Sequence, residues 1–157
     1  MHSETYSTQY RDACLALFDS NVGKYFAPSE RADFIEFLDN QAAQGHYLVF
    51  IESGKVVACG GVAASDDSED ATKPAHSAFC WGMVRHDLHG KGLGSELTQQ
   101  RLDLVVKLGL PSQVRMETSQ HTEGFYARFG FEAVEREKDG FAPGIDKVVM
   151  TMELANH

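Results

Sequence analysis

The 157 residues of this chain, 43% of them hydrophobic, suit one domain with one core, and we expect a single domain over residues 1–157. Fourteen Lys and Arg against 23 Asp and Glu give a formal net charge of −9, which argues against nonspecific binding to nucleic acid or anionic membranes and favours cationic ligands. No apolar run reaches the roughly 20 residues of a membrane span, and the N-terminus shows no basic-then-apolar signal, so we expect a cytoplasmic protein.

Apolar periodicity and turn residues predict two helices and three strands in the first 64 residues. A first helix ends near Asn21 and Gly23, and a second follows Pro28, with Ser29 as its N-cap. The Ser53-Gly54 pair is typical of a hairpin turn. In chain order the predicted elements are strand 4–8, helix 9–18, helix 29–44, strand 47–52 and strand 55–64.

Strands and helices alternate in the second half of the chain. Residues 65–76 carry four acids, a proline and small polar residues, which indicates an exposed connection. Gly109 and Pro111 stop the long helix that precedes them. The predicted elements are strand 77–84, helix 95–108, strand 113–119, short helix 122–129, and a final antiparallel pair, 131–136 and 147–154, with a loop over residues 139–144.

A glycine-rich segment, His-Gly-Lys-Gly-Leu-Gly at residues 89–94, stands between a predicted strand and a predicted helix. Glycines let backbone N–H groups approach a ligand, and a helix N-terminus favours negative charge, so the segment predicts a phosphate-binding loop. A Walker loop requires Ser or Thr after its Gly-Lys pair, whereas Gly92 follows Lys91. A dinucleotide fingerprint would place its third glycine at Ser95 and a ribose-binding acid about 20 residues on, and neither is found.

The pattern that remains is Arg/Gln-x-x-Gly-x-Gly/Ala, which fits from His89 onward with a change at its first position. It resembles the loop that holds the acyl-CoA pyrophosphate in the GNAT superfamily of N-acetyltransferases. A second segment, Phe-Tyr-Ala-Arg-Phe-Gly-Phe at residues 125–131, is similar to the family's Phe-Tyr-x-x-x-Gly-Phe motif after the fifth strand. The helix and strand between the two segments are also those of the family.

The resemblance implies an α/β fold with a mixed, mainly antiparallel central sheet, splayed between its fourth and fifth strands and flanked by helices. It implies that backbone amides near Met83 and Val84 hold the pantetheine arm of acetyl-CoA, the cosubstrate. Ser119 stands where many members carry an asparagine that bonds this arm. The expected cofactor-binding residues are Met83, Val84, His89, Gly90, Lys91, Gly92, Leu93, Gly94, Ser95 and Ser119.

The chemistry that the resemblance implies is direct acetyl transfer from acetyl-CoA to a primary amine of a small molecule or protein. Tyr126 falls at the general-acid position, where its phenol would protonate the CoA thiolate, although it could instead be a packing aromatic. The fourth strand contains no acid, so a water chain ending at Glu117 is the expected base, with Asp66, Asp67 and Glu69 as weaker candidates. Trp81 lines the acyl site or fills the core.

Two classes of function stay open at this point. Beside the acetyltransferase stands a non-catalytic acyl-CoA-binding regulatory module, because His89 and Ser119 depart from the family pattern; transfer of another acyl group is a third reading. The acceptor is chosen by variable segments, namely 22–26, 65–76 and 139–144. Exposed final strands of this architecture can pair between subunits, which allows a homodimer.

Cysteines and histidines give no sign of a disulfide framework or a metal site. Cys14, Cys59 and Cys80 are odd in number and lie in apolar surroundings, so we expect buried structural thiols. His76, His86 and His89 lack a second ligand pair at zinc spacing, and we expect no bound metal.

Overall fold

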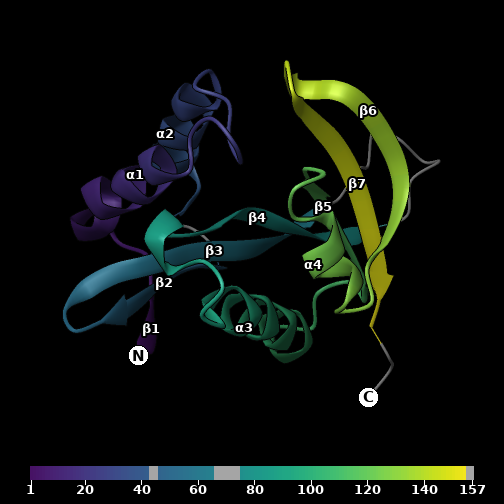
Figure 1. The fold of residues 1–157 in the computed structure, drawn as a ribbon. Helices are drawn as coiled ribbons and strands as arrows, with labels where there is room; N and C mark the ends of the chain where they lie inside the picture. Colours follow the sequence, from purple (N-terminus) through teal and green to yellow (C-terminus); the bar gives the residue numbers. More distant parts are fainter. Residues whose placement is uncertain (43–45, 66–74, 155–157) are drawn as a thin grey trace.

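The computed structural model describes residues 1–42, 46–65 and 75–154. Within these ranges seven strands form one sheet in the order β1-β2-β3-β4-β5-β7-β6, with helices on both faces (Figure 1). The strands are β1 (His2–Thr5), β2 (His46–Glu52), β3 (Lys55–Ser65), β4 (His76–Val84), β5 (Gln113–Thr118), β6 (Glu132–Ala142) and β7 (Ile145–Glu153). The helices are α1 (Arg11–Ser20), α2 (Glu30–Asn40), α3 (Leu93–Lys107) and α4 (Glu123–Ala127), with 3-10 helices η1 (Thr8–Tyr10) and η3 (His86–Leu88). The predicted mixed α/β fold is confirmed.

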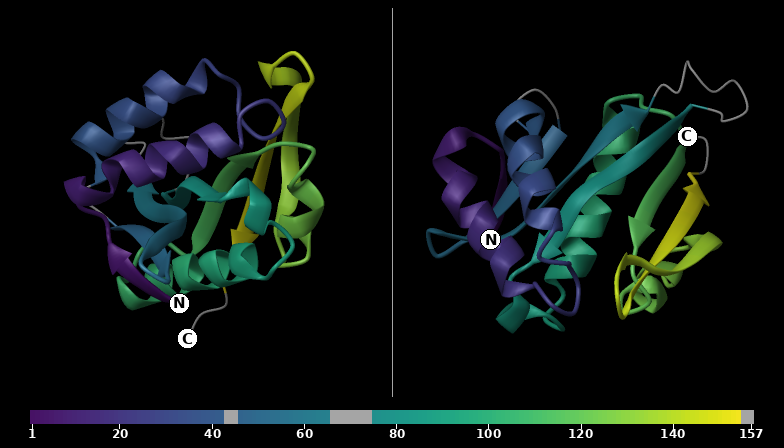
Figure 2. Two further views of the ribbon diagram at one scale, coloured as in Figure 1. Left: turned by 60° about the vertical axis from the view of Figure 1, so that its left-hand side comes forward. Right: turned by 90° about the horizontal axis from the view of Figure 1, so that it is seen from above.

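The sheet divides where β4 meets β5. These two strands run parallel, whereas the other neighbouring strands pair antiparallel. The parallel ladder consists of Ser77 opposite Val114 and Ala78 opposite Arg115, so the strands pair only where β4 begins and then separate. Figure 2 shows the β5-β7-β6 part of the sheet standing apart from the β1–β4 part. The predicted splay between the fourth and fifth strands is therefore confirmed.

Two apolar layers hold the helices to the sheet. Helices α1 and α2 cover one face of β1–β4, and α3 covers the other (Figure 1). Phe18, Phe34 and Tyr47 are buried in the first layer. Val105 of α3 packs with Val114 and Val148 in the second layer. Burial of one such apolar side chain contributes about 1.5–3 kcal/mol to stability, so each layer packs its helices firmly onto the sheet. The two layers thereby fix both walls of the region where β4 and β5 separate.

The first strand lies earlier than predicted. Strand β1 covers His2–Thr5 and residues Thr8–Tyr10 form η1, whereas the sequence predicts a strand at 4–8. Strand β1 pairs with the outer edge of β2, where Thr5 lies opposite Leu48. Most of this edge strand is exposed, so its polar side chains gave no apolar alternation to place it.

Helix α2 is shorter than predicted. It ends at Asn40, while the prediction extends to residue 44; Gln41 is the C-cap with a non-helical φ of −125°. Ala42 follows and is buried in the core beneath α1 and α2. The chain leaves the helix to bury this side chain, and residues 43–45 lie outside the described residues.

The final hairpin is longer than predicted. Strand β6 continues to Ala142 and β7 begins at Ile145, so most of the expected loop at 139–144 is strand. Asp139 has a φ of 56° at an irregularity in the β6–β7 register between Glu137 and Ala142. Its side chain accepts a hydrogen bond from Gly144 N (2.7 Å). Asp139 and Gly140 therefore form a bulge within the hairpin and do not form the turn that joins its two strands.

Candidate active site

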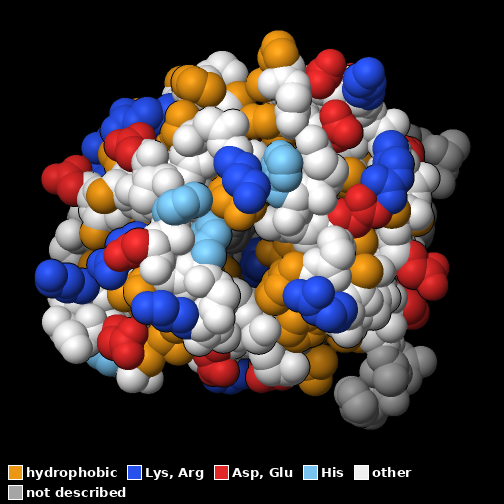
Figure 3. Space-filling model, in the orientation of Figure 1, with side chains coloured by type: hydrophobic (Ala, Val, Ile, Leu, Met, Phe, Trp, Pro, Cys, Tyr) orange, Lys and Arg blue, Asp and Glu red, His pale blue; other side chains and the backbone are white. Residues whose placement is uncertain are grey.

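A cavity of about 820 Å³ lies where β4 and β5 separate. Its lining comes from most of β4, from β5, from α3, from α4, from the segment between α1 and α2, from α2 itself and from the end of β6. In the orientation of Figure 3 the surface is hollowed near its centre, and histidine, Lys and Arg side chains gather around the hollow. A molecule with net charge −9 thus presents basic groups around this cavity.

Strand β4 bulges beside the cavity. Trp81 has a φ of 40°, and the β3–β4 register shifts between Cys59 and Gly61. The Tyr47 hydroxyl donates to the Trp81 carbonyl at 2.7 Å. The Trp81 ring packs on Phe34 of α2 at 5.0 Å between centroids, so it joins the core while also lining the cavity. The bulge turns the edge of β4 away from β5.

The backbone amide of Val84, at the end of β4, faces the cavity. Arg85 N donates to Val57 O, which makes Val84 and Ala58 a non-hydrogen-bonded pair whose own N–H and C=O groups point away from each other. The Val84 carbonyl accepts from Asn21 Nδ2 and contacts His89 Nε2, each at 2.9 Å. The Val84 N–H group also points away from β3 and faces the cleft, while the backbone of Met83 is turned to β3.

The glycine loop has the geometry that its sequence requires. Gly90 and Gly92 have φ values of 82° and 86°, in the left-handed region, and nothing lies within 4 Å of a Cβ built at either position. Gly92 is the N-cap of α3 and no side chain caps the helix, so its first N–H groups are left for an anion. A Cβ on Gly94 would lie 3.3 Å from Phe125, so that glycine lets α4 approach α3.

His89 points back to the strand. Its Nε2 contacts Val84 O, and its ring lies 5.0 Å from Tyr25 and 5.2 Å from His86 between centroids. Tyr25 is also 6.2 Å from His121, which follows β5. These aromatic contacts connect three segments at the cavity: the α1–α2 segment, the β4–α3 segment and the β5–α4 segment.

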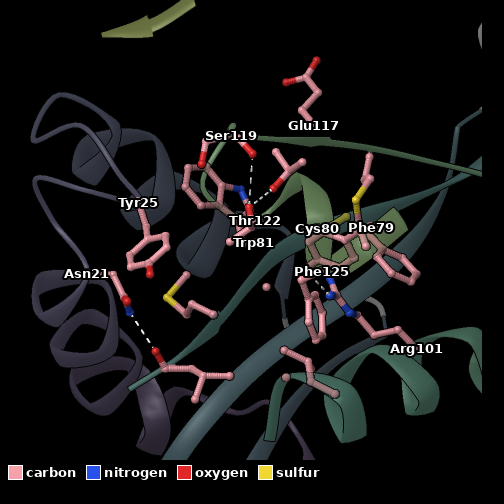
Figure 4. A pocket seen from close by; sticks show the side chains of 18 of the residues that line it. Asn21, Tyr25, Phe79, Cys80, Trp81, Arg101, Glu117, Ser119, Thr122 and Phe125 are labelled. Carbon is pink, nitrogen blue, oxygen red and sulfur yellow. Dashed lines mark hydrogen bonds between the residues drawn. The ribbon is translucent and has the colours of Figure 1, made fainter. Parts of the chain in front are cut away.

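Ser119 holds the turn into α4. Its side chain is buried and its Oγ accepts from His121 N at 3.2 Å. Its carbonyl accepts from Thr122 N and Glu123 N. The close-up in Figure 4 shows Ser119 beside Thr122 on the wall formed by β5 and α4.

Of the twelve residues proposed from the sequence, ten line the cavity. They are Met83, Val84, His89, Gly90, Gly92, Gly94, Ser95, Glu117, Ser119 and Tyr126. Lys91 and Leu93 are not among the lining residues. Lys91 is exposed on the loop, and Leu93 packs against the Phe50–Val57 side of the core.

Arg101 is a cavity residue that the sequence analysis missed. It comes from α3, is 1% exposed, and donates through Nη2 to Tyr126 Oη at 3.2 Å. Its guanidinium lies 3.9 Å from the centre of the Phe79 ring, a cation–π contact. A signal was present: residues 97, 101 and 105 form one helical stripe, and Arg101 interrupts it between Leu97 and Val105.

Two carboxylates line the cavity. Glu117 contacts Lys147 (3.4 Å), and Figure 4 shows its carboxylate directed away from Phe125 and Arg101. Glu30, at the start of α2, was not singled out by its sequence; its Oε2 accepts from Ala27 N at 2.8 Å. Burial, with smaller contributions from nearby acids that include Glu117, raises the pKa of Glu30, against the effect of the Ala27 hydrogen bond. The earlier candidates Asp66, Asp67 and Glu69 lie outside the described residues.

The cysteines are free thiols. Cys14 and Cys59 are buried as expected, but Cys80 is only partly buried and lines the cavity. Burial raises the pKa of the Cys80 thiol, while the charge of Arg101 acts in the opposite direction. Across residues 1–42, 46–65 and 75–154, no group of three or more His, Cys, Asp or Glu side chains is arranged to hold a metal ion.

The family follows from the sequence match that spans these features. Residues 22–154 match the acetyltransferase (GNAT) domain, and the chain therefore belongs to the GNAT acetyltransferase family. A search of curated proteins gave no match. In the part of the chain that the structure describes, no helix has both the length and the apolar character needed to cross a membrane.

Solved structures of acetyltransferases share the fold over nearly the whole chain. A ribosomal-protein-alanine N-acetyltransferase from Brucella melitensis has a TM-score of 0.75 at 15% identity, with 98% of this chain and 100% of that chain covered. An aminoglycoside 6′-N-acetyltransferase complexed with coenzyme A has a TM-score of 0.73 at 11% identity, with coverages of 100% and 99%. A Salmonella typhimurium protein solved with its cofactor acetyl-CoA has a TM-score of 0.73 at 15% identity, with coverages of 100% and 95%. At such identities the likeness shows the fold.

Proposed function

We propose that this protein transfers an acetyl group directly from acetyl-CoA to a primary amine of a small molecule or protein. The observation that carries the proposal is that one cavity holds an uncapped helix N-terminus behind left-handed glycines at one side and Tyr126 at another. Two structural neighbours hold coenzyme A or acetyl-CoA, which supports the same cosubstrate here. The reaction requires no metal.

Acetyl-CoA binding would use backbone groups on two elements. The N–H groups at the start of α3, from Leu93 to Ser95, with the loop at Gly90 and Gly92, would hold the pyrophosphate. The Val84 N–H would bond the pantetheine arm, which then lies between β4 and β5. Lys91, exposed on the loop, adds positive charge near the phosphates.

Acetyl transfer needs proton transfer at two atoms. The neutral amine attacks the thioester carbonyl carbon, and Tyr126 Oη donates its proton to the departing CoA sulfur. The proton of the amine leaves through water to the carboxylates of the lining, Glu117 and Glu30. The same two acids attract a cationic acceptor before it loses its proton.

A second candidate, an acyl-CoA-binding module without turnover, is favoured by one observation. His89 takes the first position of the loop motif, and its Nε2 is used at Val84 O, so it brings no fixed charge to the phosphates. The retained Tyr126, with its phenol in the cavity, favours the enzyme.

Release of the CoA thiol in the presence of a broad amine panel tests the proposal. We expect thiol release that depends on protein, acetyl-CoA and at least one amine. Binding of acetyl-CoA without thiol release would favour the module instead. The panel should contain small polyamines, amino acids and peptides with free N-termini, because Glu30 and Glu117 of the lining favour amines of several kinds.

The final strand pair offers a surface for a homodimer, which we also propose. Strand β6 is the edge of the sheet and most of its length is exposed, including Val134 at 51%. Measurement of the molar mass in solution tests this, and a monomer at high concentration would rule it out.

A further inference from the structure

Arg101 is buried without an anionic partner. Its side chain is 1% exposed, and its Nε atom has no hydrogen-bond partner. None of the ion pairs among the described residues includes it. Burial of an isolated charge is costly, and buried cations are normally paired. A guanidinium in this setting would gain stability from an anion that entered the cavity.

Three contacts fix the guanidinium beside the β4 bulge. The Phe79 ring lies under it at 3.9 Å, and Tyr126 Oη lies 3.2 Å from Nη2. The third contact is with Gly82, where a Cβ would lie 2.6 Å from Nη1, so the missing side chain makes room for the charge. Figure 4 shows Arg101 reaching from α3 to Phe79 and Phe125 in the cavity.

The bond to Tyr126 leaves the phenol proton free for another acceptor. A guanidinium can only donate, so Nη2 donates and Oη accepts. The single O–H of Tyr126 is then available to a group in the cavity. Cys80 from β4 and Tyr47 from β2 also feel the charge of Arg101, and neither is a carboxylate.

We propose that Arg101 stabilises the negative charge that reaches the CoA sulfur when the thioester breaks. The inference rests on the proposed function, since it takes the sulfur to lie at Tyr126. The electron pair of the C–S bond goes to sulfur, the Tyr126 proton moves to that sulfur, and the phenolate left on Oη faces Nη2 of Arg101. When the CoA thiol leaves the cavity, a proton from the solvent returns to Oη. One negative charge is thus shared between sulfur and Oη, beside one fixed positive charge.

Free CoA reaches the same charge state when it binds, and this can be measured without turnover. A thiol has an ordinary pKa of about 8.5, so free CoA is mainly protonated at pH 7 and binding would release up to about one proton. Acetyl-CoA has no thiol and is otherwise the same ligand. The difference in proton release between CoA and acetyl-CoA therefore reports the ionisation of the CoA sulfur in the cavity.

The experiment is calorimetric titration of the full chain with each ligand in buffers of different ionisation enthalpy. We expect CoA to release more protons than acetyl-CoA, and we expect Arg101→Met to abolish the difference while Arg101→Lys retains part of it. Arg31→Met, on the exposed Asp19 pair of α2, removes the same charge and should leave the difference unchanged. In turnover, Arg101→Met should lower kcat about 10- to 100-fold with little change in KM for acetyl-CoA.

The thermal stability of Arg101→Met is expected to change in the opposite direction to its kcat. Arg101 is buried, packs on the Phe79 ring and has no ion pair, so Arg101→Met should leave the melting temperature equal or higher. A Met variant that binds both ligands, keeps the difference in proton release and keeps kcat would overturn the inference alone. Failure of the wild type to bind either ligand would overturn the proposed function and the inference with it.

Discussion

His89 Nε2 lies 2.9 Å from the carbonyl oxygen of Val84, the residue whose N–H faces the cleft. Asn21 Nδ2 donates to the same carbonyl at 2.9 Å, so two side chains from separate segments fix this peptide group. The residue at the first position of the loop motif thereby contacts the edge of β4.

The contact predicts a graded response at position 89. His89→Leu removes the donor, and we expect acetyl-CoA affinity to fall about 3- to 10-fold, as for one hydrogen bond. His89→Gln keeps an N–H donor and should stay within about 2-fold of the wild type. Calorimetric affinities check this, with His2→Leu on the exposed β1 strand as the control. A Gln variant as weak as the Leu variant would contradict the assignment.

Gly92→Glu tests the phosphate loop. The carboxylate would face the pyrophosphate, and the left-handed φ of 86° adds strain of about 1–2 kcal/mol, so we expect loss of acetyl-CoA binding by a folded protein. Gly109→Glu is a matched control, because Gly109 also has a positive φ (65°) with open space around it but does not line the cavity. Both variants should lose similar stability, and only the first should lose binding. Equal binding by the two would remove the loop assignment.

Tyr126→Phe separates binding from turnover. The ring keeps its contact with Phe125 and loses only the hydroxyl, so acetyl-CoA affinity should be unchanged while kcat falls about 10²-fold. Tyr10→Phe removes a hydroxyl at η1, outside the cavity, and should leave kcat unaltered. Steady-state rates with thiol detection provide the measurement. Unchanged kcat in Tyr126→Phe would reject the phenol as the acid.

Glu30 predicts a pH-dependent change in stability. Its pKa is raised in the folded protein, chiefly by burial, so its contribution to stability is fully present below the unfolded pKa, near 4.5, and is lost as pH rises through the folded value. Glu30→Gln keeps an oxygen that can accept from Ala27 N and removes the charge. We expect a higher melting temperature than the wild type at pH 7, and a difference that vanishes toward pH 4. Thermal unfolding across this range checks it, with the exposed Glu36→Gln as control; a lower melting temperature at pH 7 would contradict it.

Local features of the site were predictable from the sequence. The glycine loop could be predicted because its geometry is local. The positive φ of Gly90 and Gly92 and the start of α3 depend on residues adjacent in the chain. The position of Tyr126 came from a motif of seven residues. The splay of β4 from β5 came with the family resemblance, since no local pattern encodes the separation of two parallel strands.

Features that depend on tertiary contacts were missed. Arg101 stands out only as a charge within an apolar stripe of α3, and its contacts depend on Gly82 of β4 and Tyr126 of α4, which are distant in the chain. Glu30 has no distinguishing sequence context, and its place in the lining depends on how α2 packs across the sheet. The loop expected over residues 139–144 is mostly strand with a bulge, because β6 and β7 pair again beyond it at Ala142 and Ile145.

The measurement that tests the central claim most directly is calorimetric titration of the wild-type chain with acetyl-CoA, CoA, ATP and NAD. We expect micromolar binding of acetyl-CoA and CoA, with ATP and NAD bound far more weakly, because the proposed site between β4 and β5 would take the pantetheine arm as well as the phosphates. Absence of binding by both CoA species, or equal binding of all four ligands, would contradict it.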